Sequence, residues 1–256
     1  MNVLITNDDG IQAPGIRALA RAFHQARCEV WIVAPDRERS ATGHAITMHH
    51  PLRADEVELP ELCHSALAVD GTPADCVKLA VECIMPRRPD LVISGINRGS
   101  NLGTDVLYSG TVSAALEGLI LGLPAIAVSL AGWESLDYGA AAKFAHDLAL
   151  VTLSRGLPPD TMLNVNVPIV PAPEIAGVRV TRLGQRRYRN FFEPRQDPRG
   201  RRYFWLSGEL MDCPNDADTD VGAVDLGYVS VTPIHFDLTH EDMIGTLKEW
   251  NLSFRP

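Results

Sequence analysis

The sequence lacks the features that mark several large classes of protein. Its longest nearly apolar stretch, residues 119–131, contains Pro124 and falls short of the ~20 residues that a membrane-spanning helix needs. The first nine residues include two acids and no basic start of a secretory signal. The five cysteines are odd in number and form no Cys-x-x-Cys pair, which argues against a disulfide framework. We therefore expect reduced thiols, a cytoplasmic location and no association with a membrane.

Positive charge is scarce relative to negative charge. The chain has 23 Lys and Arg residues against 32 Asp and Glu residues, a net charge of −9. A surface of this sign repels nucleic acid, so a nucleic-acid function would need a local basic patch. Residues 182–202 supply a candidate patch, because arginines and aromatic side chains alternate there. We expect this segment to be a solvated arm or a subunit contact, and a non-enzymatic module that binds phosphate or nucleic acid is the alternative.

Several nucleotide-binding and hydrolase motifs are also missing. No Gly-x-Gly-x-x-Gly follows the first predicted strand, and no Gly-Lys-Ser/Thr closes a phosphate loop. The sequence has no Gly-x-Ser-x-Gly and no His-Glu-x-x-His. These absences exclude a dinucleotide-binding Rossmann fingerprint, a P-loop, a serine-hydrolase elbow and a zincin helix.

The first two thirds of the chain alternates between two hydrophobic periods. Short continuous apolar runs, typical of strands covered on both faces, are followed by segments with helical spacing. The predicted strands are residues 3–6, 29–34, 66–69, 90–94, 125–130 and 163–167, and the predicted helices are residues 14–27, 72–85, 111–121 and 137–154. This alternation predicts an α/β fold, a Rossmann-like doubly wound and mainly parallel sheet in three layers.

The alternation ends near residue 183 of the 256. We expect residues 1–183 to form the Rossmann-like core and residues 184–256 to form a C-terminal extension that packs on the core or is exchanged between subunits. The extension begins with a β-rich arm over residues 184–212. A short helix at 220–226, a strand at 228–233 and a terminal helix at 240–249 follow.

Four polar segments follow predicted strands or open a predicted helix. They are residues 7–10, 36–44, 94–103 and 108–113. Because ligands of open α/β sheets bind at the carboxyl ends of the strands, these segments are expected to converge on one rim. Adjacent Asp8 and Asp9 repel each other, a cost that a bound cation offsets. Oxygen ligands from Asp, Ser and Asn suit Mg²⁺ or Mn²⁺, and the lack of a Cys/His cluster disfavours zinc.

The fourth polar segment opens a helix. Free amides and the helix dipole at such an N-terminus make a natural phosphate site, and the hydroxyls of Ser109 and Thr111 add donors. Plain N-capping by either residue is the alternative. A divalent cation beside such donors polarises a phosphoryl oxygen, so the four segments together predict phosphoryl chemistry.

The motifs resemble, in the same order, those of the survival protein SurE family. The matching segments are residues 4–16, 33–40, 71–77, 94–103, 108–112 and 227–233. The resemblance implies a metal-dependent phosphatase that acts on nucleoside 5′-monophosphates, and often on 3′-monophosphates. It thus implies an enzyme, a 5′-nucleotidase. A phosphatase for another monoester or for short polyphosphate is the alternative.

The resemblance also implies the site residues. One divalent ion per subunit, Mg²⁺ or Mn²⁺, would be held by Asp8, Asp9, Ser40 and Asn97. The phosphate contacts would be Asn101, Ser109, Gly110 and Thr111. Asp8 and Asp9 would be catalytic, with either water or Asp8 itself as the nucleophile. Arg98 would either touch the substrate or face solvent.

The family also implies a particular assembly. Its subunits form dimers or tetramers with exchanged C-terminal elements, which implies a homodimer or homotetramer here. The expected partner is a nucleoside monophosphate substrate, with no membrane and no stable nucleic-acid partner.

Overall fold

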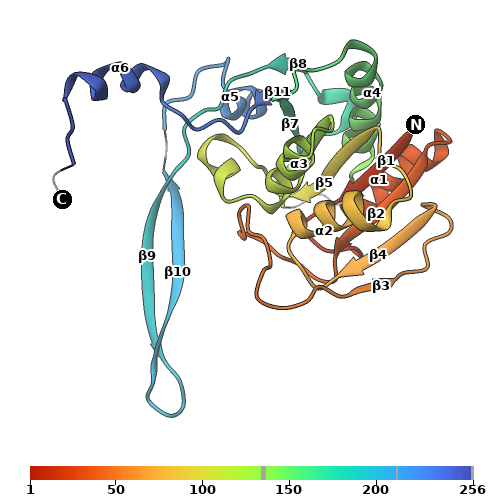
Figure 1. Cartoon of the computed structure of the whole chain (residues 1–256), viewed down its shortest axis with the longest axis horizontal. Helices are drawn as coiled ribbons and strands as arrows, with labels where there is room; N and C mark the ends of the chain where they lie inside the picture. The colour runs from red at the N-terminus through yellow and green to blue at the C-terminus, as the bar shows by residue number, and fades with distance from the viewer. Residues whose placement is uncertain (134–136, 212, 255–256) are drawn as a thin grey trace.

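The computed structural model describes residues 1–133, 137–211 and 213–254, with only the backbone at residues 190 and 191. It shows a nine-stranded sheet with helices on both faces and a separate two-stranded hairpin (Figure 1). The predicted α/β class with a mainly parallel sheet is confirmed. The strands are β1 (Asn2–Thr6), β2 (Glu29–Pro35), β3 (Ala54–Glu56), β4 (Ser65–Val69), β5 (Leu91–Arg98), β6 (Ala125–Ala131), β7 (Met162–Pro168), β8 (Gly177–Val180), β9 (Arg187–Gln196), β10 (Arg202–Met211) and β11 (Tyr228–Ile234).

Six α-helices are present in the described part of the chain. They are α1 (Pro14–Gln25), α2 (Pro73–Leu79), α3 (Gly110–Ile120), α4 (Gly139–Arg155), α5 (Asp220–Asp225) and α6 (Glu241–Glu249). Shorter turns are a π-helical turn η1 (Ala80–Ile84) and two 3₁₀ turns, η2 (Gly103–Leu107) and η3 (Ala172–Glu174). No helix among these residues has both the length and the apolar content needed to cross a membrane.

The order of the strands places a switch point at the centre of the sheet. The order is β3-β4-β2-β1-β5-β6-β7-β11-β8, with β4, β2, β1, β5, β6 and β7 parallel. From β1 the chain runs outward to β2 and β4 and then returns to β5 on the other side of β1. Ligands of open α/β sheets bind at the carboxyl ends of the strands where this reversal occurs. The ends of β1 and β5 are therefore the place to look for a site.

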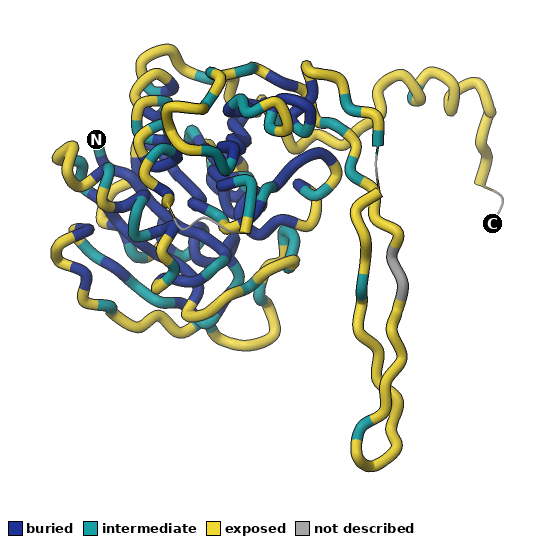
Figure 2. The backbone as a smooth tube through the Cα atoms, turned by 180° about the vertical axis from the view of Figure 1, so that it is seen from behind, coloured by how far each residue is buried: buried dark blue, intermediate teal, exposed yellow. Residues whose placement is uncertain are grey.

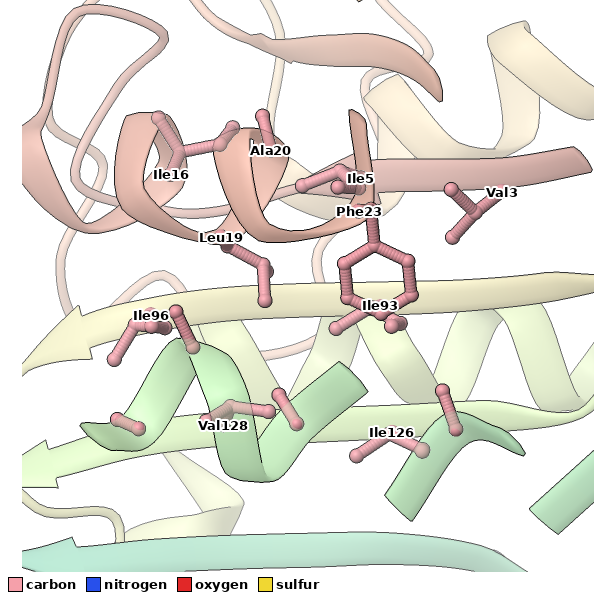
Figure 3. Packing of buried hydrophobic residues seen from close by; sticks show 14 of the residues in the cluster. Val3, Ile5, Ile16, Leu19, Ala20, Phe23, Ile93, Ile96, Ile126 and Val128 are labelled. Carbon is pink, nitrogen blue, oxygen red and sulfur yellow. The ribbon is translucent and has the colours of Figure 1, made fainter. Parts of the chain in front are cut away.

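Alternating side chains of the central strands pack into two separate layers. Val3 and Ile5 of β1 belong to the cluster that contains Leu19 and Phe23 of α1 (Figure 3). Leu4, between them, belongs to the opposite cluster, which includes residues of α2 and α3. All five side chains are fully buried. Burial on both faces accounts for the continuous apolar runs in the sequence.

Three local features differ from the sequence-based expectation. The predicted helix at 72–85 is α2 followed by the π-helical turn η1. The strands β3 and β8 were not predicted. Both lie at the edges of the sheet and neither is fully buried. These strands form because they pair with β4 and β11. An exposed edge strand needs no apolar pattern, so neither has a signal in the sequence.

The arm expected over residues 184–212 is the hairpin of β9 and β10, and residue 212 lies outside the described residues. The two strands pair from Arg187 with Met211 to Gln196 with Arg202. The hairpin extends away from the sheet and is exposed along most of its length (Figure 2). The chain then returns, and β11 lies within the large sheet between β7 and β8.

Candidate active site

The tight turn after β1 places Asp8 against the start of α3. The Nδ2 of Asn7 donates to the carbonyl oxygen of Gly10 (2.9 Å), which closes this turn. Asp8 is buried, and its Oδ1 accepts a hydrogen bond from the hydroxyl of Thr111. A Cβ on Gly110 would lie 2.8 Å from the Cβ of Asp8. Glycine at the first position of α3 is thus what lets the helix N-terminus approach the carboxylate.

Burial is the main influence on the ionisation of Asp8. It raises the pKa to about 6, against the lowering effect of the Thr111 hydrogen bond, and the neighbouring charge of Asp9 raises it further. Desolvation and a like charge both disfavour a carboxylate. A cation between Asp8 and Asp9 would favour both ionised carboxylates and so offset these two effects.

Asp9 is hydrogen-bonded to the end of β5. Its Oδ2 accepts a hydrogen bond from the backbone N–H of Arg98 (3.0 Å). Burial raises the pKa of Asp9, the Arg98 N–H lowers it, and the charge of Glu38 raises it. Glu38 is a carboxylate that the sequence analysis did not assign to the site, although it stands two residues before Ser40.

The loop after β2 lies over the turn after β1. The backbone N–H of Arg39 donates to the carbonyl oxygen of Asp8 (2.7 Å). The Nη2 of the same arginine donates to the carbonyl oxygen of Asp70 (2.9 Å). The next residue, Ser40, is exposed, and its hydroxyl donates to Oε1 of Glu38 (2.6 Å). Because Arg39 binds the backbone of Asp8, it holds the next residue, Ser40, close to the turn after β1.

Asn97 lies at the carboxyl end of β5, beside Arg98. Its Nδ2 donates to the carbonyl oxygen of Gly99 (2.9 Å), which leaves Oδ1 as the atom that could bind a cation. The register of β5 against β6 shifts between Ser94 and Asn97, a local irregularity at the end of the strand. Asp9, Arg98 and Asn97 are thus neighbours, as the predicted convergence of the loops requires.

Asn101 is held by polar side chains of β6 and β7. Its Nδ2 donates to the hydroxyl of Ser129 (2.8 Å), and its backbone N–H donates to Oδ1 of Asn166 (2.8 Å). The Nδ2 atoms of Asn164 and Asn166 both donate to its carbonyl oxygen. These supporting residues are fully buried. Sequence analysis missed them, although asparagines alternate with apolar residues at 163–167 and polar groups in a buried strand need partners.

The N-terminus of α3 uses its hydroxyl groups within the protein. Ser109 is the N-cap, and its Oγ accepts from the backbone N–H of Val112 (3.1 Å). Thr111 donates its only hydroxyl hydrogen to Asp8. The hydroxyl of Thr111 is thus committed to Asp8, and its backbone N–H also lies close enough to that carboxylate to lower its pKa. The hydroxyl of Ser109 accepts from Val112 and keeps its hydrogen for a ligand.

The available donors fit a hard divalent cation. Asp8 and Asp9 supply carboxylate oxygens, Ser40 a hydroxyl and Asn97 an amide oxygen, which are ligands for Mg²⁺ or Mn²⁺. Over residues 1–133, 137–211 and 213–254, no three His, Cys, Asp or Glu side chains group together as metal ligands. The candidate site is therefore a mixed one, in which two acids are completed by neutral oxygens.

Comparison with known proteins identifies the family of the chain. The family described as "Survival protein SurE" matches residues 3–190. The chain belongs to the SurE family. Within the family it is similar to "5′-nucleotidase SurE" of Symbiobacterium thermophilum, with 60% identity over 98% of this chain and 99% of that protein. The relative from Heliobacterium modesticaldum, with the same name, is 56% identical over 98% of this chain and 92% of its own length.

A solved SurE structure has the same fold. The SurE protein from Aquifex aeolicus aligns with a TM-score of 0.85 and 42% identity, over 98% of this chain and 100% of that one. The alignment therefore spans the region beyond residue 183, which includes the β9–β10 hairpin and β11. SurE membership, expected from the motifs, is confirmed.

Proposed function

We propose that this SurE protein is a metal-dependent 5′-nucleotidase, which hydrolyses nucleoside 5′-monophosphates to a nucleoside and phosphate. The contact between Asp8 and Thr111 carries the proposal, because it joins a pair of carboxylates to the N-terminus of a helix. The candidate cation site and the candidate anion site are therefore adjacent. The names of the relatives, "5′-nucleotidase SurE", support the same reaction.

In this proposal Asp8, Asp9, Ser40 and Asn97 hold one Mg²⁺ or Mn²⁺. When bound, the ion acts as a Lewis acid on a phosphoryl oxygen. The backbone N–H groups of Gly110 and Thr111 bind the other phosphoryl oxygens, helped by the dipole of α3.

Side chains around the helix N-terminus complete the proposed site. Ser109, through its free hydroxyl hydrogen, and Asn101 complete the phosphate contacts. The hydrogen bond from Thr111 holds the Asp8 carboxylate in one orientation.

A phosphate-release assay tests this function. Purified protein is given 5′- and 3′-nucleoside monophosphates, p-nitrophenyl phosphate and polyphosphate, each with Mg²⁺, Mn²⁺ or EDTA. We expect release from 5′-monophosphates that needs the metal, and its loss in Asp9→Asn. Glu61→Gln, which changes an exposed acid in an ion pair with Arg17, is the matched control and should retain activity.

Other outcomes of the panel assign other functions. Stronger release from 3′-monophosphates or from polyphosphate would change the preferred substrate but keep the phosphatase. Release unaffected by EDTA would contradict the metal requirement. No release with any metal, together with salt-dependent binding of RNA to the basic hairpin, would favour the non-enzymatic alternative.

The proposal includes a homodimer or homotetramer built through the C-terminal elements. Phe204, Trp205 and Leu206 of β10 are largely exposed, as is Leu247 of α6 to a lesser degree, and a lone two-stranded hairpin is marginally stable in water. A second copy of the chain would cover these side chains. Light scattering should give a multiple of 27.9 kDa, which Leu206→Arg should lower.

The free thiols support a reducing compartment. Cys28, Cys63, Cys76, Cys83 and Cys213 are all free. We place the protein in the cytoplasm, where thiols stay reduced. Fractionation of the source cells tests this location.

A further inference from the structure

An exposed tryptophan stands beside the candidate metal loop. Trp133 follows the end of β6 and is 68% exposed. A Cβ on Gly99 would lie 2.9 Å from its Cζ2 atom, so the indole lies against the backbone of that glycine. Gly99 is two residues from Asn97. Tryptophan combines a large apolar ring with a polar N–H, which suits it to contact a ligand at the rim of a site.

Arg98 holds the tryptophan in place. Its Nη2 donates to the carbonyl oxygen of Trp133 (3.1 Å), and its guanidinium carbon lies 5.7 Å from the centre of the indole ring. The backbone N–H of Gly99 also donates to the carbonyl oxygen of Leu130 (3.0 Å). Trp133 is therefore held at the end of β5 by a cation–π contact with its ring and a hydrogen bond to its carbonyl oxygen, both from Arg98.

The same arginine connects the tryptophan to the catalytic carboxylates. Its backbone N–H binds Oδ2 of Asp9, while its side chain binds Trp133. Arg98 thus lies between Asp9, which would hold the metal, and the exposed indole. A nucleoside monophosphate carries a flat ring one sugar away from its phosphate, and so offers one group to the candidate metal site and another to the indole.

We propose that Trp133 stacks against the base of a bound nucleoside monophosphate and that Arg98 positions it to do so. The proposal rests on the nucleotidase function and adds the contact that selects an aromatic base over a bare sugar phosphate. Stacking of bases on aromatic side chains is largely independent of which base is present, so Trp133 favours nucleotides as a class.

The test compares two substrates that differ only in the base. Steady-state kinetics are measured with adenosine 5′-monophosphate and with ribose 5-phosphate for wild type, Trp133→Ala and Trp133→Phe. We expect Trp133→Ala to raise KM for the nucleotide by between about 5-fold and 150-fold, the range that loss of one stacked base gives. KM for ribose 5-phosphate should be unchanged, and Trp133→Phe should restore most of the nucleotide affinity.

A second exposed tryptophan provides the matched control. Trp250, at the end of α6, is 61% exposed, and Trp250→Ala should leave both KM values as in wild type. An unchanged nucleotide KM in Trp133→Ala would overturn the proposal. An equal rise for both substrates would also overturn it, since Trp133 would then only support the turn at Asp9. A wild type that releases phosphate from ribose 5-phosphate but not from nucleotides would instead contradict the proposed function.

Discussion

The Nη1 atom of Arg186 lies 2.9 Å from Oδ2 of Asp105 and also donates to the hydroxyl of Ser100. The hydroxyl of Tyr188 donates to the same carboxylate oxygen (2.8 Å). These contacts tie the root of the β9–β10 hairpin to η2, the turn between Asn101 and Ser109. The base of the hairpin therefore contacts the loop that connects two of the expected phosphate-binding residues.

We expect Asp105→Ala to destabilise the protein. The substitution leaves Arg186, which is mostly buried, and the Tyr188 hydroxyl without their shared acceptor. The free energy of unfolding should fall by about 1–3 kcal/mol, measured by urea denaturation. Glu193→Ala, which breaks an exposed pair with Arg195 inside the hairpin, is the control and should have no measurable effect. Equal effects of the two variants would contradict the special role of Asp105.

Gly110→Ala should separate α3 from Asp8. The new Cβ would lie within 3 Å of both the Cβ and the Oδ2 of Asp8, so the helix or the carboxylate must move. A displacement of about 1 Å at a reacting group can cost ~100-fold in rate, and we expect a loss of that order in kcat/KM. Gly245→Ala places a Cβ in open space on α6 and is the matched control. Full activity in Gly110→Ala would show that this contact does not matter.

Asp8→Asn should stabilise the protein when no metal is present. The pKa of Asp8 is raised from 3.8 to about 6 in the folded chain, so the unfolded chain ionises first as pH rises. The ionised carboxylate therefore lowers the free energy of unfolding progressively between pH 3.8 and 6, and by about 3 kcal/mol above that range. In EDTA, the variant should gain up to this amount at pH 7 and little below pH 4. A destabilised variant at pH 7 would contradict the burial argument.

Metal should reverse the order of stability. A chain with both carboxylates binds a cation more tightly than one with Asp9 alone. A bound cation stabilises the fold by an amount that grows with the logarithm of metal concentration over the dissociation constant. Millimolar Mn²⁺ should therefore raise the melting temperature of wild type more than that of Asp8→Asn. Equal shifts would place the metal elsewhere.

Glu117 should contribute stability that is lost in acid. Its hydrogen bond with His44 (2.8 Å) and its pair with Lys78 (3.3 Å) hold its pKa below the ordinary value of 4.5, against the effect of burial. A lowered pKa means that the contribution is complete above pH 4.5 and disappears as pH falls through the folded value. Glu117→Gln should thus lower the melting temperature at pH 7, by less as the pH falls below 4.5. Glu82→Gln, an exposed acid near the same lysine, should have a smaller effect at every pH.

The amino-acid sequence by itself determined the class of fold and gave the segments of the candidate site. Continuous apolar runs and helical periods located the central strands and helices, because hydrophobic period reflects which faces are buried. The polar segments after these strands follow from the same pattern. The family motifs then named the candidate ligands, and the family is confirmed.

Only the tertiary structure decided which of these groups meet. Thr111 binds Asp8 across 103 positions, Asn166 supports Asn101 across 65, and Arg186 reaches Asp105 across 81. Edge strands such as β8 and the place of Trp133 beside Gly99 were also unpredicted. The local hydrophobic pattern indicates whether a side chain is buried, but it does not indicate which distant residue the side chain contacts. Partners depend on strand order, register and loop closure, which the whole chain settles together as it packs.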